Sequence, residues 1–303
     1  MLGRYEFEVL TYIERKGFSG SVRETADELC ISGSIVSQEL ESLEKQGFIA
    51  GPEGDRRITE KGLEQLEPFR VKRAVILAAG FGKRMMPATK DRPKPMVTVN
   101  GVRIIDTLLD ALVSAGIRDI TIVGGYCFSK LSELLDKYPF LELIENRDYA
   151  VTNNISSAVL ASGRLSGGCY LCEADLYISS PQSVITKYQY ASNILGSWSL
   201  KTDDWSFDMK EGLLSDYRKG GTYRYNYYGI SYWTAQDCDK LARDFKEVYA
   251  TPEGRDLFWE FIPFILKKED YKVEIRPCRK QDIMEIDNYY ELAQLDPSYL
   301  KEE

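Results

Sequence analysis

Residues 77–96 read LAAGFGKRMMPATKDRPKPM, and this stretch decides the fold of most of the chain. It continues the apolar run 74–77, which is typical of a buried β-strand, and it brings two glycines next to Lys83 and Arg84. A further cation, Lys94, lies between two prolines. Small residues let a backbone close around a polyphosphate, and exposed amides and cations balance its charge. The stretch therefore predicts a phosphate-binding loop after a first β-strand.

The composition of the 303-residue chain limits the chemistry that it can perform. The sequence contains no histidine, which excludes Ser-His and Cys-His nucleophiles and zinc sites built on histidine. Any bound metal must therefore be held by carboxylates, which favours a hard ion such as Mg²⁺. A net charge of −8 argues against a general nucleic-acid binder, but a local cationic loop can still bind a nucleotide.

The same composition predicts the compartment. With 44% hydrophobic and 28% charged residues, the chain is typical of soluble globular proteins. No apolar run approaches the ~20 residues of a membrane span, and the first residues do not resemble a signal peptide. Cys169 and Cys172 fall in a predicted strand, where positions three apart face opposite sides. We expect a cytoplasmic protein with reduced, structural cysteines and no membrane partner.

Residues 1–69 differ in pattern from the rest and are expected to form a separate small domain. Apolar periodicity predicts three helices, a hairpin and a last helix, near residues 7–16, 22–29, 35–46, 48–59 and from 59 onward. This order of helix-turn-helix and hairpin resembles the winged helix of bacterial transcription regulators.

The charge of this segment does not favour DNA binding. Residues 1–70 carry nine Lys or Arg against fourteen Asp or Glu, a net charge of −5. The helix expected to enter a DNA groove holds three glutamates against Lys45 alone. Packing, dimerisation or a lost binding function is therefore the favoured interpretation. DNA binding is the alternative, and a homodimer is one assembly open to the chain.

From residue 70 to residue 303, predicted strands and helices alternate. The strands are expected at 73–77, 119–123, 141–145 and 169–172, and the helices near 104–113, 129–138 and 155–163. Such alternation predicts a Rossmann-like α/β domain with a mainly parallel sheet, whose ligands bind at the carboxyl ends of the strands. Two later stretches rich in aromatic residues, about 194–235 and 271–287, predict a mixed sheet that covers the site.

The glycine-rich stretch matches the nucleotidyltransferase signature L-x-A-G-x-G-x-R-[LM]-x-P-(x)n-P-K-[PA]-[LM] at every fixed position. It is neither a Walker A loop nor a Rossmann glycine motif. The nucleotide-binding residues expected from it are Leu77, Ala78, Ala79, Gly80, Phe81, Gly82 and Lys83. Lys83 and Arg84 can neutralise the pyrophosphate leaving group. The resemblance to the nucleotidyltransferase signature implies that Lys94 contacts the α-phosphate. These three cations are the candidate catalytic residues.

Two acidic positions are expected to hold a metal ion. Asp175 follows an apolar strand, and an acid at the end of a central strand suits Mg²⁺ bound to a triphosphate. In residues 283–287, alternation puts Glu285 and Asp287 on one face, and Asp287 is the second expected ligand. Glu173 would face the same way as Asp175, next to the metal or as the partner of an amine.

Residues 152–157 read TNNISS and predict a helix start. Asn153, Asn154 and Ser156 are candidates to read the edge of a pyrimidine base. Simple helix capping without ligand contact is the alternative.

The stretch 71–295 resembles the bacterial CTP:phosphocholine cytidylyltransferases. The resemblance is carried by residues 77–96, 123–126, 146–150, 153–154, 173–175, 228–233, 256–259 and 285–287. It implies that Tyr126 binds the nucleotide and that Asp175 and Asp287 bind Mg²⁺. It also implies that the acceptor phosphate attacks the α-phosphate of CTP and releases pyrophosphate.

The acceptor is expected to be a small amino-alcohol phosphate or phosphonate, because an ammonium group needs aromatic faces and a carboxylate. The candidate acceptor-binding residues are Glu173, Trp205, Tyr228, Tyr232, Asp256, Trp259 and Glu285. For each aromatic residue, ordinary core packing is the alternative.

The sequence therefore predicts a Mg²⁺-dependent cytidylyltransferase that makes CDP-choline from CTP and phosphocholine. The nearest alternative is the same reaction on 2-aminoethylphosphonate or phosphoethanolamine. A methylated ammonium prefers an aromatic cage and a primary amine prefers carboxylates, and the sequence supplies both. The remaining alternatives are a sugar-1-phosphate nucleotidylyltransferase and a winged-helix regulator whose second domain senses a nucleotide.

Overall fold

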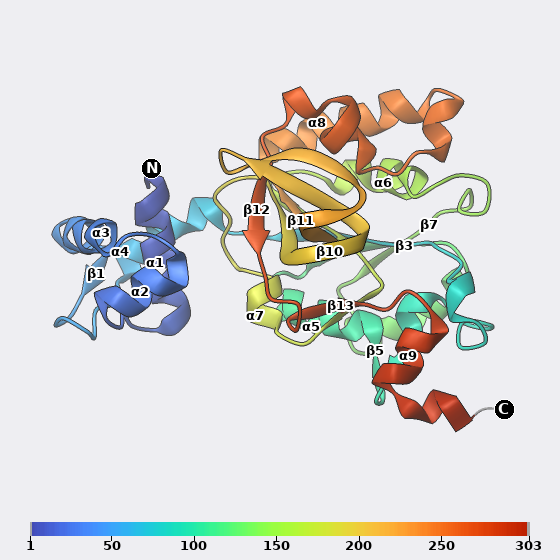
Figure 1. Ribbon diagram of the computed structural model, residues 1–303, viewed down its shortest axis with the longest axis horizontal. Helices are drawn as coiled ribbons and strands as arrows, with labels where there is room; N and C mark the ends of the chain where they lie inside the picture. The colour runs from blue at the N-terminus through green and yellow to red at the C-terminus, as the bar shows by residue number, and fades with distance from the viewer. Residues whose placement is uncertain (1, 302–303) are drawn as a thin grey trace. The chain divides into compact units, whose positions relative to one another are not determined.

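The computed structural model describes residues 2–301 (Figure 1). Contacts divide the chain into two compact units. The first unit is Met1–Arg70 with Tyr188–Tyr190, and the second is Val71–Lys187 with Ala191–Glu303. The division falls next to the expected boundary, but the sequence did not indicate that three residues from far along the chain join the first unit.

The first unit consists of helices and one short hairpin. Its elements are α1 (Arg4–Lys16), α2 (Val22–Leu29), α3 (Gly33–Lys45), β1 (Ile49–Ala50), β2 (Arg57–Ile58), α4 (Glu60–Leu66) and the 3-10 turn Glu67–Phe69. Ser21, Ser32 and Thr59 begin α2, α3 and α4, because each side chain accepts a hydrogen bond from a free backbone amide of the first turn. β1 and β2 pair antiparallel.

Aromatic contacts attach residues 188–190 to the core of the first unit. Tyr188 and Tyr190 belong to the same apolar cluster as the fully buried Leu10 and Ile13. The ring of Tyr190 stacks on Phe69 at 5.5 Å between centroids.

Seven strands form the sheet of the second unit, in the spatial order β10-β12-β11-β8-β3-β6-β7. They are β3 (Arg73–Ala78), β6 (Asp119–Gly124), β7 (Glu142–Glu145), β8 (Cys169–Glu173), β10 (Asn193–Lys210), β11 (Leu213–Trp233) and β12 (Glu274–Pro277). β8, β3, β6 and β7 run parallel, whereas β11 is antiparallel to β8 and β10. The sheet is therefore mixed and mainly parallel, as predicted.

Helices cover both faces of this sheet (Figure 1). α5 (Ile104–Ser114) and α7 (Pro181–Val184) lie on one face, and α6 (Ile155–Ala161) and α8 (Ala235–Tyr249) lie on the other. α9 (Tyr289–Leu295) packs instead in a separate apolar cluster with Met85 and Ile104. Side chains of β3 alternate between two cores: Ala74 and Ile76 pack with α5, and Val75 and Leu77 pack with α6 and α8. Cys172 lies in the first core and Cys169 in the second, both as free thiols, so they face opposite sides as predicted.

Small elements complete the second unit. β4 (Thr98–Val99) and β5 (Val102–Arg103) form a short hairpin, and β9 (Leu176–Ile178) pairs antiparallel with the distant β13 (Ile283–Glu285). Short 3-10 segments are Lys83–Met85, Lys94–Met96, Phe128–Leu134, Ser162–Arg164, Glu253–Asp256, Lys268–Asp270 and Pro297–Lys301, and Ile262–Leu266 is a π-helical turn. Within residues 2–301, no helix combines the length and apolar character that a membrane span requires.

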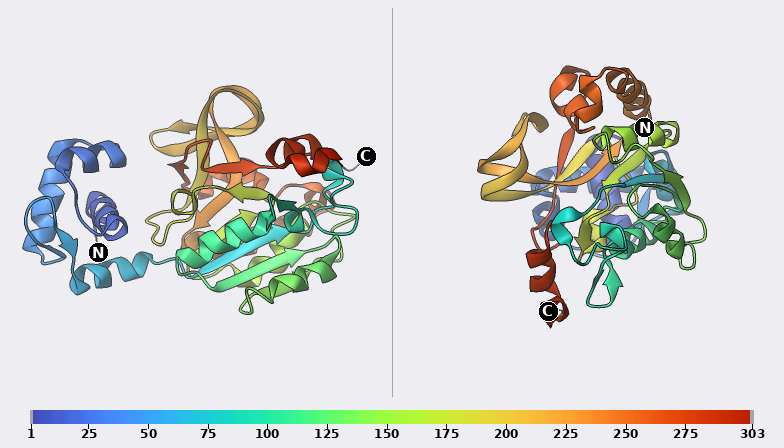
Figure 2. Two further views of the ribbon diagram at one scale, coloured as in Figure 1. Left: turned by 90° about the horizontal axis from the view of Figure 1, so that it is seen from below. Right: turned by 90° about the vertical axis from the view of Figure 1, so that its right-hand side faces the viewer.

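One segment differs from the sequence prediction. The helix expected near 129–138 is a 3-10 segment, Phe128–Leu134, whose buried Leu131 and Leu134 have the three-residue spacing of that helix type. The aromatic stretch 194–235 belongs to the mixed sheet, as predicted, and forms one long hairpin, β10–β11, that curls back on itself (Figure 2). Within it, Phe207 of β10 pairs with both Tyr217 and Tyr225 of β11, so the far end of the hairpin folds back onto its own base.

Candidate active site

A cavity of about 260 Å³ opens at the carboxyl ends of β3 and β8. The predicted site residues that line it are Leu77, Ala78, Ala79, Gly80, Gly82, Lys94, Asn153, Asn154, Glu173 and Asp175. It is also lined by Pro95, Asn146, Tyr149, Thr152, Ser157, Ala174 and Phe258, which we did not predict as site residues. The parallel pairing of β3 with β8 explains why two loops more than 80 positions apart share one cavity.

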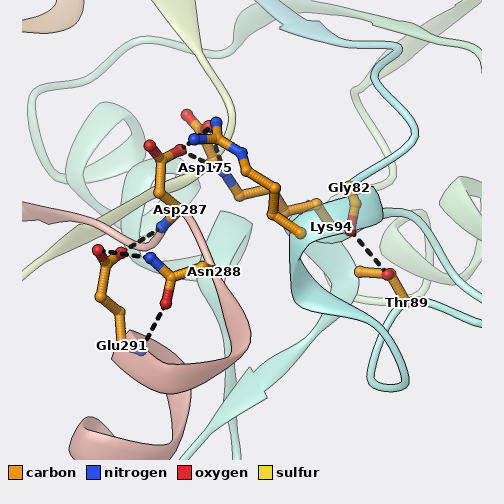
Figure 3. Close-up of polar contacts among 8 residues, drawn as sticks. Gly82, Thr89, Lys94, Asp175, Asp287, Asn288 and Glu291 are labelled. Carbon is orange, nitrogen blue, oxygen red and sulfur yellow. Dashed lines mark hydrogen bonds and ion pairs between the residues drawn. The ribbon is translucent and has the colours of Figure 1, made fainter. Parts of the chain in front are cut away.

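The glycine-rich loop is held closed by Thr89 (Figure 3). The Thr89 hydroxyl donates a 2.9 Å hydrogen bond to the Gly82 carbonyl, and Thr89 is fully buried. Gly82 has φ = 62°, and a Cβ there would lie 3.0 Å from both Lys94 Cβ and Thr89 Cγ2. Glycine is therefore required at this position both for the backbone angle and for the close approach.

Lys94 is the cation nearest to the acids of the site (Figure 3). Its ammonium donates hydrogen bonds to Asp175 Oδ2 at 2.6 Å and to Asp287 Oδ1 at 3.3 Å. Burial alone would lower the pKa of Lys94, but the charges of the two aspartates outweigh this effect and raise it. Arg84 donates to Asp287 Oδ1 at 2.9 Å from a side chain that is 70% exposed. Both side chains therefore reach the carboxylate of Asp287.

Three carboxylates converge beside Lys94. One oxygen each from Asp175, Glu285 and Asp287 lies within 4.8 Å of the others. The backbone holds them in register, because Glu285 pairs with Leu176 and the Ile286 amide donates to the Asp175 carbonyl at 3.2 Å. Burial and the charges of the two aspartates raise the pKa of Glu285 well above its usual range. Glu285, expected at the acceptor, therefore lies with the expected metal ligands.

The donor set fits a hard divalent cation. Asp175 Oδ1 is buried and has no hydrogen-bond partner among the described residues, so one carboxylate oxygen is left free for a ligand. Three carboxylate oxygens are the ligand type that Mg²⁺ prefers. A cation there would also relieve the repulsion among the three acids.

A second acidic group joins Glu173, which lines the cavity, to the buried Glu260, which does not. Asn154 Nδ2 donates to Glu173 Oε1 and to Glu260 Oε2, both at 3.3 Å, and Asn154 Oδ1 accepts from the Trp259 amide. Burial and mutual repulsion raise the pKa of Glu173 well above its usual range, and burial also raises that of Glu260. Two carboxyl groups this close share a proton rather than both ionise. Glu260 was not predicted, although it directly follows the segment 256–259.

The asparagine-rich segment before α6 is fixed by its own hydrogen bonds. Asn146 Nδ2 donates to the hydroxyls of Ser156 and Ser157 at 2.9 Å, and the Ser156 hydroxyl donates to the Asn153 carbonyl at 2.9 Å. Asn153 Nδ2 donates to the Asp256 carbonyl at 3.1 Å. Asn153 and Asn154 line the cavity, whereas the buried Ser156 does not and supports the loop instead.

Two aromatic rings lie beside the cavity, those of Phe81 and Tyr126, and the ammonium of Lys83 contacts the first of them. The Phe81 ring lies 5.6 Å from Tyr126 and 5.0 Å from Tyr149, and Lys83 Nζ lies 4.6 Å from its centroid. The Tyr126 hydroxyl donates to the Lys90 carbonyl at 2.9 Å. Tyr126 thus fastens the loop that carries the cations, and it does not line the cavity.

Two of the aromatic residues expected at the acceptor lie in the protein core. Tyr232 packs against Tyr170 at 5.8 Å, and Trp259 is 1% exposed and packs against Trp233 at 6.2 Å. Side chains enclosed in this way do not reach a ligand in the cavity. Their positions correct the expectation that both contact the acceptor, because apolar packing uses the same side chains as a cage does.

Three further acceptor candidates, Trp205, Tyr228 and Asp256, lie outside the cavity lining as well. Trp205 stacks on Tyr217 at 5.0 Å and contacts Phe258 at 6.2 Å. The hydroxyls of Tyr228 and Ser197 are 2.7 Å apart. Asp256 is exposed and offers its backbone carbonyl to Asn153. Of the predicted acceptor residues, only Glu173 lines the cavity.

Comparison with known proteins assigns this site to a family. The family described as "Nucleotidyl transferase" matches residues 73–155, which include the glycine-rich loop. A 2-aminoethylphosphonate cytidylyltransferase from Lancefieldella rimae is 37% identical over 229 residues, covering 75% of this chain and 93% of the relative. The chain belongs to the cytidylyltransferases of the nucleotidyl transferase family.

Other relatives of this cytidylyltransferase agree with the assignment. A choline-phosphate cytidylyltransferase from Streptococcus pneumoniae is 30% identical over 232 residues, covering 74% of this chain and 96% of the relative. A solved structure of CTP:phosphocholine cytidylyltransferase from the same species superimposes with a TM-score of 0.69 at 27% identity. That match covers 76% of this chain and 99% of the solved chain. The protein is therefore an enzyme with cytidylyltransferase activity on a phosphate or phosphonate acceptor.

Proposed function

We propose that the enzyme transfers CMP from CTP to 2-aminoethylphosphonate and releases pyrophosphate. The observation that carries this choice is a pair of carboxyl groups: Glu173, which lines the cavity, and Glu260, which lies against it behind the lining. A primary ammonium has three N–H donors, which a carboxyl pair can accept, whereas a trimethylammonium has none. The relative that is 37% identical is named for the same acceptor.

Phosphocholine is the second candidate acceptor. Tyr149 and Phe258 give the cavity two aromatic side chains, which can contact a methylated ammonium. The relative that is 30% identical is named for this substrate. However, Trp259 and Tyr232 lie in the core, and a full aromatic cage is therefore not supported by the lining of the cavity.

A direct test is the rate of pyrophosphate release with CTP and each acceptor. We expect kcat/KM for 2-aminoethylphosphonate to exceed that for phosphocholine by about tenfold or more. Phosphocholine has no N–H donor and would leave the oxygens of the buried carboxyl pair without hydrogen-bond partners. Phosphoethanolamine separates the amine from the phosphonate, and glucose-1-phosphate tests the sugar-phosphate alternative. An equal or higher kcat/KM for phosphocholine would overturn the choice of acceptor.

The residues of the chain support an in-line reaction. An oxygen of the acceptor phosphonate forms a bond to the α-phosphorus of CTP. The bond from that phosphorus to the oxygen that bridges the α- and β-phosphates breaks, and this oxygen leaves with pyrophosphate. We infer that Lys94 balances the charge that builds at the α-phosphate, and that Lys83 and Arg84 balance the charge of the departing pyrophosphate. Residues 78–80 and Gly82 line the side of the cavity where the nucleotide is expected, and their amides are candidates to bind its phosphates.

We infer that Asp175, Asp287 and Glu285 hold Mg²⁺. The support is their convergence within 4.8 Å and the free, buried Asp175 Oδ1. When bound, such an ion neutralises phosphate oxygens and makes pyrophosphate a better leaving group.

We also infer that the first unit is a winged helix that does not read DNA. The cations at its expected DNA face are engaged within the unit: Arg56 with Glu44 at 3.2 Å, and Arg57 with Asp55 at 3.0 Å. Lys61 Nζ donates to the Gln46 carbonyl at 2.9 Å. Binding of the full chain to duplex DNA that weakens steeply with added salt would contradict this inference.

A further inference from the structure

The first turn of α9 contains hydrogen bonds that reach back to Asp287 (Figure 3). Glu291 Oε2 accepts from the Asp287 amide at 2.7 Å, and Glu291 Oε1 accepts from Asn288 Nδ2 at 2.8 Å. The Glu291 amide donates to Asn288 Oδ1 at 3.0 Å. In an ordinary capping box, the glutamate accepts from the amide of the cap residue itself, which here is Asn288. Glu291 reaches one residue further back, to the backbone of an expected metal ligand.

The backbone on the other side of Asp287 is also fixed. The preceding Ile286 donates its amide to the Asp175 carbonyl at 3.2 Å. Its side chain is fully buried in an apolar cluster with Met85 and Leu292. Asp287 therefore lies between two backbone hydrogen bonds, one to the strand end that carries Asp175 and one to Glu291. Its carboxylate has little freedom apart from side-chain rotation.

The helix that carries Glu291 is itself anchored. At its end, the Asn100 amide donates to Asp296 Oδ2 at 2.7 Å, and Asn100 Nδ2 donates to the Leu295 carbonyl at 3.2 Å. The following turn is tied down as well, because the Tyr299 hydroxyl donates to the Thr98 carbonyl at 2.9 Å. The Glu291 carboxylate is therefore held by a fixed element rather than by a mobile tail.

We propose that Glu291 is a positioning residue that fixes Asp287 for a divalent cation. This inference rests on the proposed role of Asp287 as a metal ligand. Groups that orient a metal ligand usually change metal affinity by about 10–100-fold when they are removed. Loss of the Glu291 carboxylate leaves the Asp287 amide without its partner, and the three acids then no longer hold one arrangement. The effect should appear in metal binding more than in folding.

The test compares Glu291→Ala and Glu291→Gln with Glu24→Ala. Glu24 is the matched control, because it holds the same cap position in α2 of the first unit and accepts from the Ser21 amide at 2.9 Å. Two quantities are measured: the Mg²⁺ concentration for half-maximal rate, and the Kd for Mn²⁺ in the presence of CTP by calorimetry. We expect Glu291→Ala to raise both by about tenfold or more, and Glu24→Ala to leave both unchanged.

Glu291→Gln should give an intermediate increase, because its amide oxygen can still accept from Asp287 while its NH₂ group faces the Asn288 donor. Changes of less than about twofold in both quantities, with a Tm loss like that of Glu24→Ala, would make Glu291 a helix cap only and overturn the inference. If Glu291→Ala does not fold, Glu291→Gln is judged by the same limit. A parent enzyme that needs no divalent cation would instead overturn the proposed metal site.

Discussion

The ammonium of Lys94 donates a 2.6 Å hydrogen bond to Asp175 Oδ2, although 81 positions separate the two residues in the chain. Lys94 lies on the segment that closes the glycine-rich loop, and Asp175 follows the end of β8. Both side chains are mostly buried, with 12% and 19% exposed. This ion pair joins the loop expected to bind the nucleotide to the carboxylates expected to bind the metal.

Replacement of Lys94 by alanine should reduce kcat by about 10²-fold or more, because a cation directed at the charge that develops on the α-phosphate is lost. Lys90→Ala is the matched control, since Lys90 is an exposed cation of the same loop. The measurement is pyrophosphate release at saturating CTP and acceptor. If the two variants lost activity equally, Lys94 would contribute only to the general charge of the cavity mouth.

Removal of divalent cations with EDTA should abolish turnover, and added Mg²⁺ should restore it. Asp175→Asn should then require about tenfold or more Mg²⁺ for half-maximal rate, because an amide oxygen is a weaker ligand than a carboxylate. The control is Asp110→Asn. Asp110 is a surface carboxylate on α5 that accepts a hydrogen bond from Lys137, and it is not among the residues that line the cavity. Full turnover in EDTA would show that the three acids serve another purpose.

Gly82→Ala should raise KM for CTP and lower stability by about 1–3 kcal/mol, because a left-handed backbone angle is costly for alanine. The added methyl group would also press on Lys94 and Thr89. Gly163→Ala is the control, because a Cβ at Gly163 would meet no atom within 4 Å and the residue is exposed. Equal KM values for the two variants would mean that the loop accommodates a side chain at position 82 without weaker binding of CTP.

Much of this site could be anticipated because its signals are local in sequence. The glycine-rich loop after the first strand, and acids directly after strands, fix their own positions relative to the sheet. The parallel arrangement then brings strand ends together, which is how Lys94 and Asp175 meet. Alternation along residues 283–287 likewise put Glu285 and Asp287 on one face, and both join Asp175.

The acceptor end could not be anticipated in the same way. Tryptophan and tyrosine serve both cores and ammonium cages, and only the packing reveals that Trp259 and Tyr232 are enclosed. Glu260 has no neighbouring pattern that marks it, because its partner Glu173 is 87 positions away and meets it only in the folded chain. Contacts between distant segments decide these positions, as they do for Tyr188–Tyr190 in the first unit.

Glu260→Gln should weaken the preference for a primary amine. The glutamine cannot share a proton with Glu173, so the acceptor pair for an ammonium is lost. We expect kcat/KM for 2-aminoethylphosphonate to fall by about 10-fold or more relative to that for phosphocholine. Glu247→Gln is the control, because Glu247 is an exposed glutamate on α8 whose partner is Lys267. An unchanged ratio of the two kcat/KM values would exclude the carboxyl pair as the determinant of the acceptor.

Asp244→Asn should reveal a contribution to the free energy of unfolding that depends on pH and is independent of the active site. Asp244 is fully buried and accepts from the Tyr271 hydroxyl at 2.7 Å, from Arg243 at 2.9 Å and from Lys267 at 3.1 Å. Burial alone would raise the pKa of Asp244, but these donors together outweigh burial and lower it below its ordinary value. The ionised side chain therefore stabilises the fold fully above the unfolded-state pKa of about 3.9, and this contribution disappears as the pH falls through the lower pKa of the folded state.

We expect Asp244→Asn to lower the free energy of unfolding of the second unit by about 2–4 kcal/mol near pH 7, because a buried charged acceptor is lost. The difference from the parent should be smaller at pH 3, below the unfolded-state pKa of about 3.9, because the unfolded chain there gains a proton on Asp244 that the folded state disfavours. Urea unfolding at both pH values measures this difference. Turnover near pH 7 should stay close to that of the parent, because Asp244 is not among the residues that line the cavity. A difference that is equal at the two pH values would mean that the side chain stabilises the fold by shape and neutral hydrogen bonds rather than by its charge.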